Sequence, residues 1–471
     1  MQRIIMHIDM NSYFASCEQQ DNLPWRGRPL GVCEHLGGII IAPSVEAKRW
    51  GVKTGMLVWE AKKLCPQIIL TITNPDRYRY YTAKFLQVFE DYAEDIERYS
   101  IDEAFLDVTK VCNVRIKNYE SLLRQGFGGQ ARIKEEQWLC ADPFVEAERI
   151  AKEIKVRMKT EVGDYLRCSV GIGWSKLIAK IGSDMQKPDG LTILRPEDKS
   201  LLYKKLSLTD IPGIGTRQAK RLMGHGIRTL QDLRDCPRET LVRWFGILGH
   251  HLWSMGQLEG LWCENFTQAT PLKSVGHMYT IAKEFRHVPK IGEQALYRLS
   301  EMVAKRLRGL GMGATALFAH VADKDHNFFG GTRQLGTPTS TGQEIFIAAR
   351  HAVVRDLAGI WPALVNRVGV TAFGLRPMCV QQSLFPAVNK RHKLDVALDM
   401  VNKKYAKDEW LEARRHSKQV LERAALGSTP NHKDQAVLLP APAFFAQRFI
   451  RDSIGFGRMK EFRVSSYNRG G

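Results

Sequence analysis

The hydrophobic pattern of the first 190 residues alternates short apolar runs with amphipathic stretches. Uninterrupted apolar runs are typical of buried strands, whereas apolar residues at every third or fourth position are typical of helices. The pattern predicts strands at 3–9, 38–43, 68–74, 98–109 and 166–174. It predicts helices at 10–20, 45–50, 57–64, 76–94, 143–162 and 175–186. Strands and helices mixed in this order predict an α/β layer with a sheet that is covered on one face.

The alternation is interrupted at residues 110–141, which contain a hexapeptide with three glycines at 125–130. We expect an irregular or inserted loop here. A phosphate-binding role for the glycines would require a strand before them and a helix after them, and the pattern predicts neither.

The later part of the chain changes character twice. Short helices broken by glycine are expected from about residue 203, and strand-like runs return within 272–376 around a predicted helix at 292–308. Beyond 377 the chain is basic and less regular, so we expect a flexible or weakly folded tail.

Composition and charge indicate a folded protein with a polyanionic partner. A length of 471 residues suggests three or more domains of about 100–200 residues each. The apolar fraction of 44% is ample for packed cores. The net charge of +19 favours nucleic acid as the partner, and a basic protein without such a partner is the alternative.

The nine cysteines are scattered singly and include no C-x-x-C pair. Neither a disulfide framework nor a structural zinc site is therefore expected, and a reducing cytosol fits best. Asp9 interrupts any hydrophobic region that a signal peptide would need, and no apolar stretch is long enough to span a membrane. We expect a cytoplasmic monomer without membrane contact.

Carboxylates are placed in two of the predicted strands. Asp9 ends the first strand, and Asp102 and Glu103 lie within the strand at 98–109. Adjacent residues of a flat strand point to opposite faces, so the backbone must turn if both are to face one site. Such carboxylates suit Mg²⁺ when phosphates supply further ligands, and paired ions serve nucleotidyl transfer. The alternative to a metal site is a solvent-exposed turn that merely carries these charges.

Two further motifs are compatible with a nucleotide site. Tyr13 and Phe14 follow the first strand, where a rigid aromatic could exclude a ribose 2′-hydroxyl; a core aromatic is the alternative. Lys176 lies near the start of a predicted helix, where a cation and backbone N–H groups suit a triphosphate, although the sequence is not a Walker A motif.

A glycine motif and a short tail peptide indicate binding partners. Gly213 and Gly215 are followed by Arg217 and Lys220, which predicts a helix-hairpin-helix whose amides and cations contact DNA phosphates. An ordinary helical hairpin is the alternative. The peptide Gln-Gln-Ser-Leu-Phe at 381–385 suits capture in an apolar groove of a partner.

Together these motifs resemble the Y-family DNA polymerases, most closely the DNA polymerase IV-like (DinB-type) branch. The matching stretches occur in the family's order. They are IDMNSYFASCE at 8–18, YSIDEAFLDVT at 99–109, SVGIGWSKLIAKIGSDMQKPDG at 169–190, IPGIG at 211–215 and KSVG at 273–276.

The resemblance implies an α/β (α+β) right-hand polymerase. Its expected parts are a ferredoxin-like palm at 1–20 and 75–190 with an insertion at 113–141, fingers at 21–74, a helix-hairpin-helix thumb at 191–262, a little finger at 272–376 and a tail at 377–471. Primer–template DNA and deoxynucleoside triphosphates would be its substrates, and translesion, error-prone synthesis in DNA damage tolerance and repair its activity. A bacterial cytosol would be its location.

The resemblance also implies roles for individual residues. Two Mg²⁺ ions, or Mn²⁺, would be held by Asp9, Asp102, Glu103 and the carbonyl of Met10. The nucleotide would contact Phe14 as the sugar-selecting aromatic, Tyr13, Lys48 and Lys176. A sliding clamp would bind through Gln381, Leu384 and Phe385.

One stretch departs from the polymerase IV-like pattern. Val45-Glu46-Ala47-Lys48 stands where that branch usually has Tyr-Glu-Ala-Arg, and it resembles the polymerase V catalytic-subunit branch more closely. Lys48 keeps the positive charge but lacks the guanidinium group, which can donate two parallel hydrogen bonds to a phosphate.

Two other functions are alternatives. One is a non-catalytic Y-family relative acting as a clamp-bound scaffold, which would be expected to lose the three carboxylates. The other is a metal-dependent nuclease.

Overall fold

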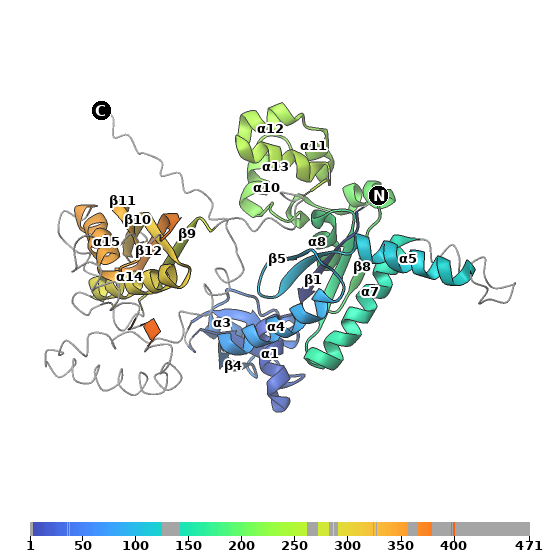
Figure 1. Cartoon of the computed structure of the whole chain (residues 1–471), viewed down its shortest axis with the longest axis horizontal. Helices are drawn as coiled ribbons and strands as arrows, with labels where there is room; N and C mark the ends of the chain where they lie inside the picture. The colour runs from blue at the N-terminus through green and yellow to red at the C-terminus, as the bar shows by residue number, and fades with distance from the viewer. Residues whose placement is uncertain are drawn as a thin grey trace. The chain divides into compact units, whose positions relative to one another are not determined.

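The computed structural model describes most of the chain up to residue 378 (Figure 1). The described residues are 3–124 apart from 35 and 37, 142–260, 272–281, 291–323, 327–356, 365–378 and single positions at 286, 325, 397, 399 and 400. The chain divides into two compact units, Met1–Ala269 and Thr270–Gly471. Among the described helices, none has the length and hydropathy that crossing a membrane requires.

The first unit is built on a five-stranded sheet with the strand order β5-β6-β1-β7-β8. Its strands are β1 (Ile5–Met10), β5 (Ile96–Arg98), β6 (Glu103–Asp107), β7 (Cys168–Gly173) and β8 (Leu191–Ile193). All neighbours pair antiparallel except β7 and β8. Nearly every residue of β1 and β7 is buried, and successive residues point to opposite faces. Both faces of the sheet centre are therefore covered, and the prediction of one covered face was wrong.

Helix α8 (Lys176–Met185) lies against β7 and β1. A side chain at Gly171 on β7 would meet the carbonyl oxygen of Ala179 at 2.0 Å, so only glycine allows this close approach. Ile5, Phe105 and Ala179 form a small apolar cluster between the helix and the sheet. The packing fixes the register of α8 along β1, which carries Asp9.

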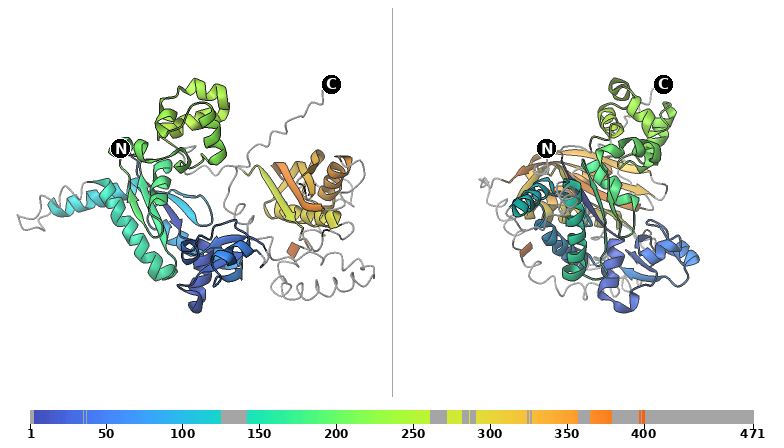
Figure 2. Two further views of the ribbon diagram at one scale, coloured as in Figure 1. Left: turned by 180° about the vertical axis from the view of Figure 1, so that it is seen from behind. Right: turned by 90° about the vertical axis from the view of Figure 1, so that its right-hand side faces the viewer.

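The other helices around this sheet are shown from two further sides in Figure 2. They are α1 (Tyr13–Asp21), α4 (Pro75–Glu90), α5 (Thr109–Arg124) and α7 (Pro143–Arg157), which continues into the π-helical turn η2 (Met158–Val162). Asp142 caps α7 by accepting from the N–H of Phe144 at 2.8 Å, and Pro143 occupies the first turn. The predicted helix at 143–162 thus corresponds to α7 and η2 together.

Two predictions for this region were wrong. The strand predicted at 98–109 is a hairpin of β5 and β6, because the N–H groups of Tyr99 and Ser100 both donate to the carbonyl of Glu103 and close a turn. The stretch from 110 begins as helix α5 rather than as an irregular loop. Arg115 pairs with Glu153 of α7 at 2.9 Å, and such tertiary contacts leave no local pattern. Residues 125–141 lie outside the described residues.

A smaller sheet in the first unit has the strand order β3-β2-β4. Its elements are β2 (Leu30–Cys33), which was not predicted, β3 (Ile40–Pro43), β4 (Ile69–Ile72), α2 (Val45–Arg49), α3 (Val58–Leu64) and the short η1 (Leu23–Trp25). Ile40, Ala47, Val58 and Ala61 are among the residues of its core.

A helical part follows the central sheet. Its elements are η3 (Pro196–Asp198), α9 (Lys199–Lys205), η4 (Leu208–Asp210), α10 (Thr216–Gly224), α11 (Leu230–Asp235), α12 (Arg238–Phe245) and α13 (Ile247–Gly256). Its buried core also contains Leu177, Ile178 and Ile181 of α8. Helix α8 therefore contributes to the sheet on one side and to this core on the other.

The described part of the second unit contains a four-stranded antiparallel sheet and the helices α14 (Ile291–Gly309) and α15 (Gly342–Asp356). Its order is β11-β10-β12-β9, with β9 (Ser274–Thr280), β10 (Met312–Asp323), β11 (Phe328–Thr339) and β12 (Val365–Pro377). Helices α14 and α15 share one hydrophobic core with the sheet. The predicted helix at 292–308 is confirmed by α14.

Candidate active site

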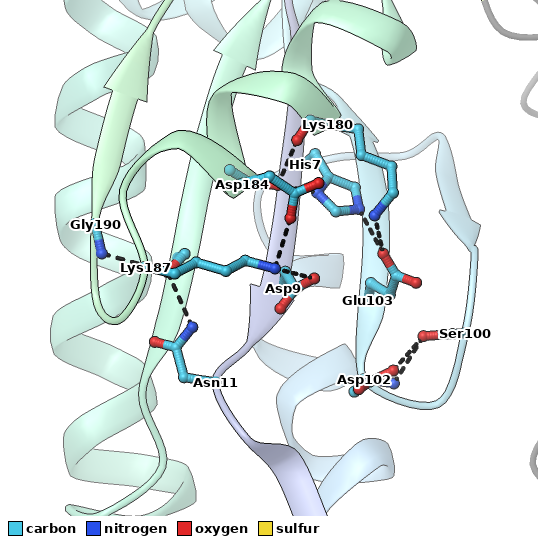
Figure 3. Close-up of polar contacts among 12 residues, drawn as sticks. His7, Asp9, Asn11, Ser100, Asp102, Glu103, Lys180, Asp184, Lys187 and Gly190 are labelled. Carbon is cyan, nitrogen blue, oxygen red and sulfur yellow. Dashed lines mark hydrogen bonds and ion pairs between the residues drawn. The ribbon is translucent and has the colours of Figure 1, made fainter. Parts of the chain in front are cut away.

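Three carboxylates lie next to one another at the ends of two paired strands (Figure 3). Asp9 on β1 is the register partner of Glu103, the first residue of β6. Asp102 lies in the preceding turn, and its carbonyl accepts from the N–H of Met10 at 2.9 Å. The turn that the adjacent carboxylates require is therefore present, and Asp102 and Glu103 do not alternate as in a flat strand.

Glu103 is held by two basic side chains. Its Oε2 lies 2.6 Å from the Nζ of Lys180 on α8 and 3.1 Å from the Nε2 of His7 on β1. Burial alone would raise the pKa of Glu103, but the hydrogen bond with His7 and the charge of Lys180 outweigh it and lower the pKa to about 2. Glu103 is therefore an oriented carboxylate that stays ionised.

His7 links this carboxylate to helix α8. The ring is fully buried, and its Nδ1 lies 2.7 Å from the Oγ of Ser183. Burial lowers the pKa of His7, which favours the neutral ring. In the neutral tautomer whose Nε2–H donates to Glu103, Nδ1 is an acceptor that faces the Ser183 hydroxyl, and this hydroxyl also lies 2.9 Å from the carbonyl oxygen of Lys180. The ring orientation is thus set from both sides.

Asp102 carries no contact with a cationic side chain among the described ion pairs and hydrogen bonds, and Ser100 is its side-chain partner. Burial, followed by the negative charges of Glu103 and Asp9, raises the pKa of Asp102 to about 6, although the Ser100 hydroxyl opposes the shift. The three carboxylates are therefore close enough to act on one another electrostatically.

This shift predicts a pH-dependent stabilisation by Asp102→Asn in protein kept in a metal chelator. A raised folded-state pKa contributes stability that is complete below the unfolded value of 3.8 and is lost as the pH rises through about 6. At pH 8 the variant should be more stable than the parent by about 2 kcal/mol, since one pKa unit corresponds to about 1.4 kcal/mol and screening reduces the effect.

Denaturant unfolding at pH 8 and near pH 4 measures this difference, and the advantage should vanish at the lower pH. Asp76→Asn is the matched control, because Asp76 has a side chain that is 88% exposed. An equal gain in stability for both variants, or a gain that does not depend on pH, would contradict the prediction that the ionised Asp102 carboxylate destabilises the folded protein.

Asp9 contacts a lysine from the loop after α8. The Nζ of Lys187 lies 2.9 Å from Oδ2 of Asp9 and 2.7 Å from Oδ1 of Asp184. The loop is tied to the end of β1, since the N–H of Asp189 donates to Oδ1 of Asn11 at 2.6 Å. Lys187 is therefore a fixed neighbour of the carboxylates.

The two predicted aromatics have different surroundings. Tyr13 is buried, and its hydroxyl donates to the carbonyl of Tyr78 at 2.7 Å, which is the environment of a core residue. Phe14 is half-buried and stacks on the ring of Tyr78 with the centroids 4.4 Å apart. Of the two, only Phe14 presents ring surface outside the core.

The two predicted nucleotide lysines are also placed differently. Burial and the charge of Lys187 lower the pKa of Lys48, while Asp9 and Asp102 act in the opposite sense, so Lys48 lies within electrostatic reach of the carboxylates. Lys176 is buried and ion-paired with Glu97 of β5. Lys48 is thus within electrostatic reach of the carboxylates, whereas the ammonium of Lys176 is paired with Glu97.

Sequence reasoning missed five residues of this site. They are His7, Lys180, Ser183, Asp184 and Lys187. Two local signals were available. His7 precedes Asp9 by two positions and so shares its strand face, and Lys180 and Asp184 have the four-residue spacing of one helix face.

The predicted glycine turn of the helical part is present. Gly213 has a φ of 99°, which favours glycine, and Gly215 precedes the first residue of α10. The buried side chains of Ile211 and Ile214 hold the turn, while its glycines are exposed. Arg217 and Lys220 are exposed on α10. The arrangement presents backbone N–H groups and cations on one surface.

The carboxylates match a hard divalent cation in chemistry but do not form a ready metal site. Within the described ranges no group of three or more His, Cys, Asp or Glu side chains converges on one point. Asp9 and Glu103 instead contact Lys187 and Lys180. Oxygen ligands of this kind suit Mg²⁺ or Mn²⁺, and a bound ion would have to replace lysine contacts.

The clamp-motif residues Gln381, Leu384 and Phe385 lie outside the described residues.

Comparison with protein families identifies three matching segments. The impB/mucB/samB family matches residues 8–184, and its C-terminal domain matches residues 272–384. A SAM-like helix-hairpin-helix tandem matches residues 205–247. The segment at 8–184 contains all three carboxylates, and the segment at 205–247 contains the glycine turn.

Similar proteins cover most of the chain. DNA polymerase IV of Moorella thermoacetica is 33% identical over 413 residues, which are 85% of this chain and 93% of that protein. DNA polymerase IV of Alkalilimnicola ehrlichii is 32% identical over 79% of this chain and 96% of that protein. A solved Y-family DNA polymerase chimera superposes with a TM-score of 0.64 at 22% identity, covering 79% of this chain and 98% of the chimera.

Proposed function

Because the chain belongs to the Y family of DNA polymerases, whose members are DNA-directed DNA polymerases, we propose that Asp9, Asp102 and Glu103 carry nucleotidyl transfer in template-directed translesion synthesis. The observation that supports this site most directly is the juxtaposition of the three carboxylates across the β1–β6 pair. Error-prone synthesis past damaged bases, in damage tolerance and repair, is the role that we propose for it.

Two divalent cations, Mg²⁺ or Mn²⁺, would be held by Asp9, Asp102, Glu103 and the carbonyl of Met10. When bound, they supply activation of the primer 3′-hydroxyl and neutralisation of charge on the triphosphate. His7 orients the Glu103 carboxylate, which limits the rearrangement that ligation requires.

The basic side chains would bind the anionic nucleotide. Lys187 contacts Asp9, and Lys48 lies within electrostatic reach of Asp9 and Asp102, where ammonium groups suit a triphosphate. The ring of Phe14, supported by Tyr78, would bound the sugar position. Lys176 stays a predicted triphosphate contact because the sequence resembles the Y family. The structure gives it no such place, since its ammonium pairs with Glu97.

The elements also support a division into polymerase parts. We assign the five-stranded sheet to the palm, the sheet of β2, β3 and β4 to the fingers, the helices α9–α13 to the thumb and the second unit to the little finger. The peptide at 381–385 would tether the chain to a sliding clamp. A reducing cytosol is supported by the cysteines of the described residues, which are all free.

Primer extension tests the proposal directly. The intact protein, a primed DNA template, Mg²⁺ and the four deoxynucleoside triphosphates should give products whose sequence follows the template. Shortening of the labelled primer would instead favour a nuclease. Folded, DNA-bound protein that neither extends nor shortens the primer would favour a scaffold, and either result would overturn the proposal.

The glycine turn of the thumb yields a separate prediction about DNA affinity. Replacing Arg217 and Lys220 together by alanine should weaken binding of primer–template DNA uniformly across sequences, because these exposed cations would contact phosphates. The slope of log affinity against log salt concentration should fall by about 2, since each phosphate contact contributes roughly 0.9.

Fluorescence anisotropy over a series of salt concentrations measures this slope. The matched control replaces Lys152 and Lys159, two exposed lysines around the end of α7, by alanine and removes the same charge. A slope that changes equally in both double variants would show that only net charge matters and would contradict a thumb contact.

A further inference from the structure

Asp9 contacts a cation that belongs to the chain itself. The ammonium of Lys187 lies 2.9 Å from Asp9 and 2.7 Å from Asp184, so it bridges two carboxylates (Figure 3). Asp9 has a side chain that is only 16% exposed, and that of Lys187 is 36% exposed. The contact is therefore a partly desolvated ion pair, in which charges interact more strongly than on an open surface.

The position of Lys187 is fixed by the loop that carries it. The N–H of Asp189 donates to Asn11, and the Nζ of Lys155 donates to the carbonyl of Asp189 at 2.6 Å. Asn11 in turn donates to the Oγ of Ser169 at 2.9 Å, which anchors the loop to β7. These hydrogen bonds hold the loop two residues after Lys187, so we take rotation of the lysine side chain as the movement of the ammonium.

A divalent cation on Asp9 would be repelled by this ammonium, which contacts the Oδ2 of the same carboxylate. The two positive charges would lie within a few ångströms of each other, where repulsion is strong at the dielectric of a protein surface. The repulsion favours departure of Lys187 from Asp9, and Asp184, which it already contacts, is available to retain it.

We propose that Lys187 is the resident cation of Asp9 in the nucleotide-free protein and that Asp184 is the positioning residue that keeps Lys187 beside the site when a metal ion replaces it. This inference rests on the proposed function, because it takes Asp9 as a metal ligand. The lysine thus competes with the metal ion for Asp9 and stays beside the site when the ion is bound.

Mn²⁺ binding to the protein without DNA and nucleotide tests the competition. The loss of free Mn²⁺ signal in electron paramagnetic resonance gives the affinity without any turnover. Lys187→Gln should bind Mn²⁺ about tenfold or more tightly than the parent, because a unit positive charge beside the ligand is removed. Lys187→Arg, which retains the charge, should bind as weakly as the parent. The gain should disappear when Asp9→Asn is added.

Lys152→Gln is the matched control, since it removes an exposed lysine of α7 that pairs with Glu148. An unchanged Mn²⁺ affinity in Lys187→Gln, or an equal gain in Lys152→Gln, would overturn the proposal. The readout is a gain in binding, so a variant that fails to fold cannot imitate it.

The role of Asp184 is tested by a double-mutant cycle. Asp184→Asn should weaken Mn²⁺ binding in the parent, because Lys187 then has only Asp9 as a partner. In the Lys187→Gln background the same change should have much less effect, since there is no lysine to retain. An equal loss in both backgrounds would show that Asp184 acts only through its own charge and would contradict the positioning role.

The same proteins separate this inference from the proposed function. Primer extension by the parent with unaltered Mn²⁺ binding in Lys187→Gln would leave the polymerase assignment intact and overturn the resident cation. Tighter Mn²⁺ binding in a protein whose parent extends no primer would support the lysine–metal competition and refute the polymerase site.

Discussion

Glu103→Gln is expected to abolish template-dependent primer extension, with a loss of at least about 10³-fold in the single-turnover rate, while primer–template binding is largely retained. The glutamine keeps the shape of the side chain and can still accept from Lys180 or His7, but it loses the charge that a divalent cation requires. A loss of this size corresponds to about 4 kcal/mol of transition-state stabilisation, within the range that electrostatic groups supply. Rapid-quench measurement with saturating DNA gives the rate.

The control for this variant is Glu94→Gln, the same chemical change at a side chain that is 80% exposed and pairs with Lys110. It should extend primers at the parental rate. Extension by Glu103→Gln within tenfold of the parent would remove Glu103 from the chemistry and would require a different set of metal ligands.

Folding of the Glu103 variant needs its own measurement, because the carboxylate also contributes stability. A depressed pKa of about 2 means that this contribution is present above the ordinary value of 4.5 and is lost as the pH falls through about 2. The variant should therefore be somewhat less stable than the parent at neutral pH. Circular dichroism at the assay temperature distinguishes a folded, inactive protein from an unfolded one.

The sequence predicted the carboxylates because their positions follow from local patterns. Asp9 ends an apolar run, and the Asp102–Glu103 pair interrupts another, so strand pairing alone is enough to bring them together. The same holds for the turn of Gly213 and Gly215, whose chemistry is contained in five consecutive residues. Features encoded over a few neighbouring positions are accessible without the fold.

The rest of the site depends on the packing of α8, which no local pattern shows. The close approach at Gly171 brings Lys180 and Ser183 over β1, and the loop beyond the helix brings Lys187 to Asp9. The prediction for Lys176 relied on its place at a helix start, but the neighbouring β5 supplies Glu97 as its partner. Strand β5 was itself hidden, because the turn at 99–102 lies inside one continuous strand-like run.

Phe14→Ala is expected to raise ribonucleotide incorporation, lowering the preference for deoxynucleotides by about 10²-fold. Phe14 is half-buried on the stacked ring of Tyr78, so its position is fixed while part of the ring stays outside the core. A rigid ring at the sugar position would exclude a 2′-hydroxyl by contact, and alanine removes that contact without adding a polar group. The ratio of kcat/KM for a deoxynucleotide to that for the matching ribonucleotide measures the preference.

Tyr13→Phe is the control for this prediction, because Tyr13 is the neighbouring aromatic but donates its hydroxyl to the carbonyl of Tyr78 within the core. It should lose some stability and keep the parental sugar preference. The two variants thus separate an aromatic that meets the nucleotide from one that packs the core. Unchanged sugar discrimination in a folded, active Phe14→Ala protein would show that Phe14 is a core residue as well and that another part of the chain selects the sugar.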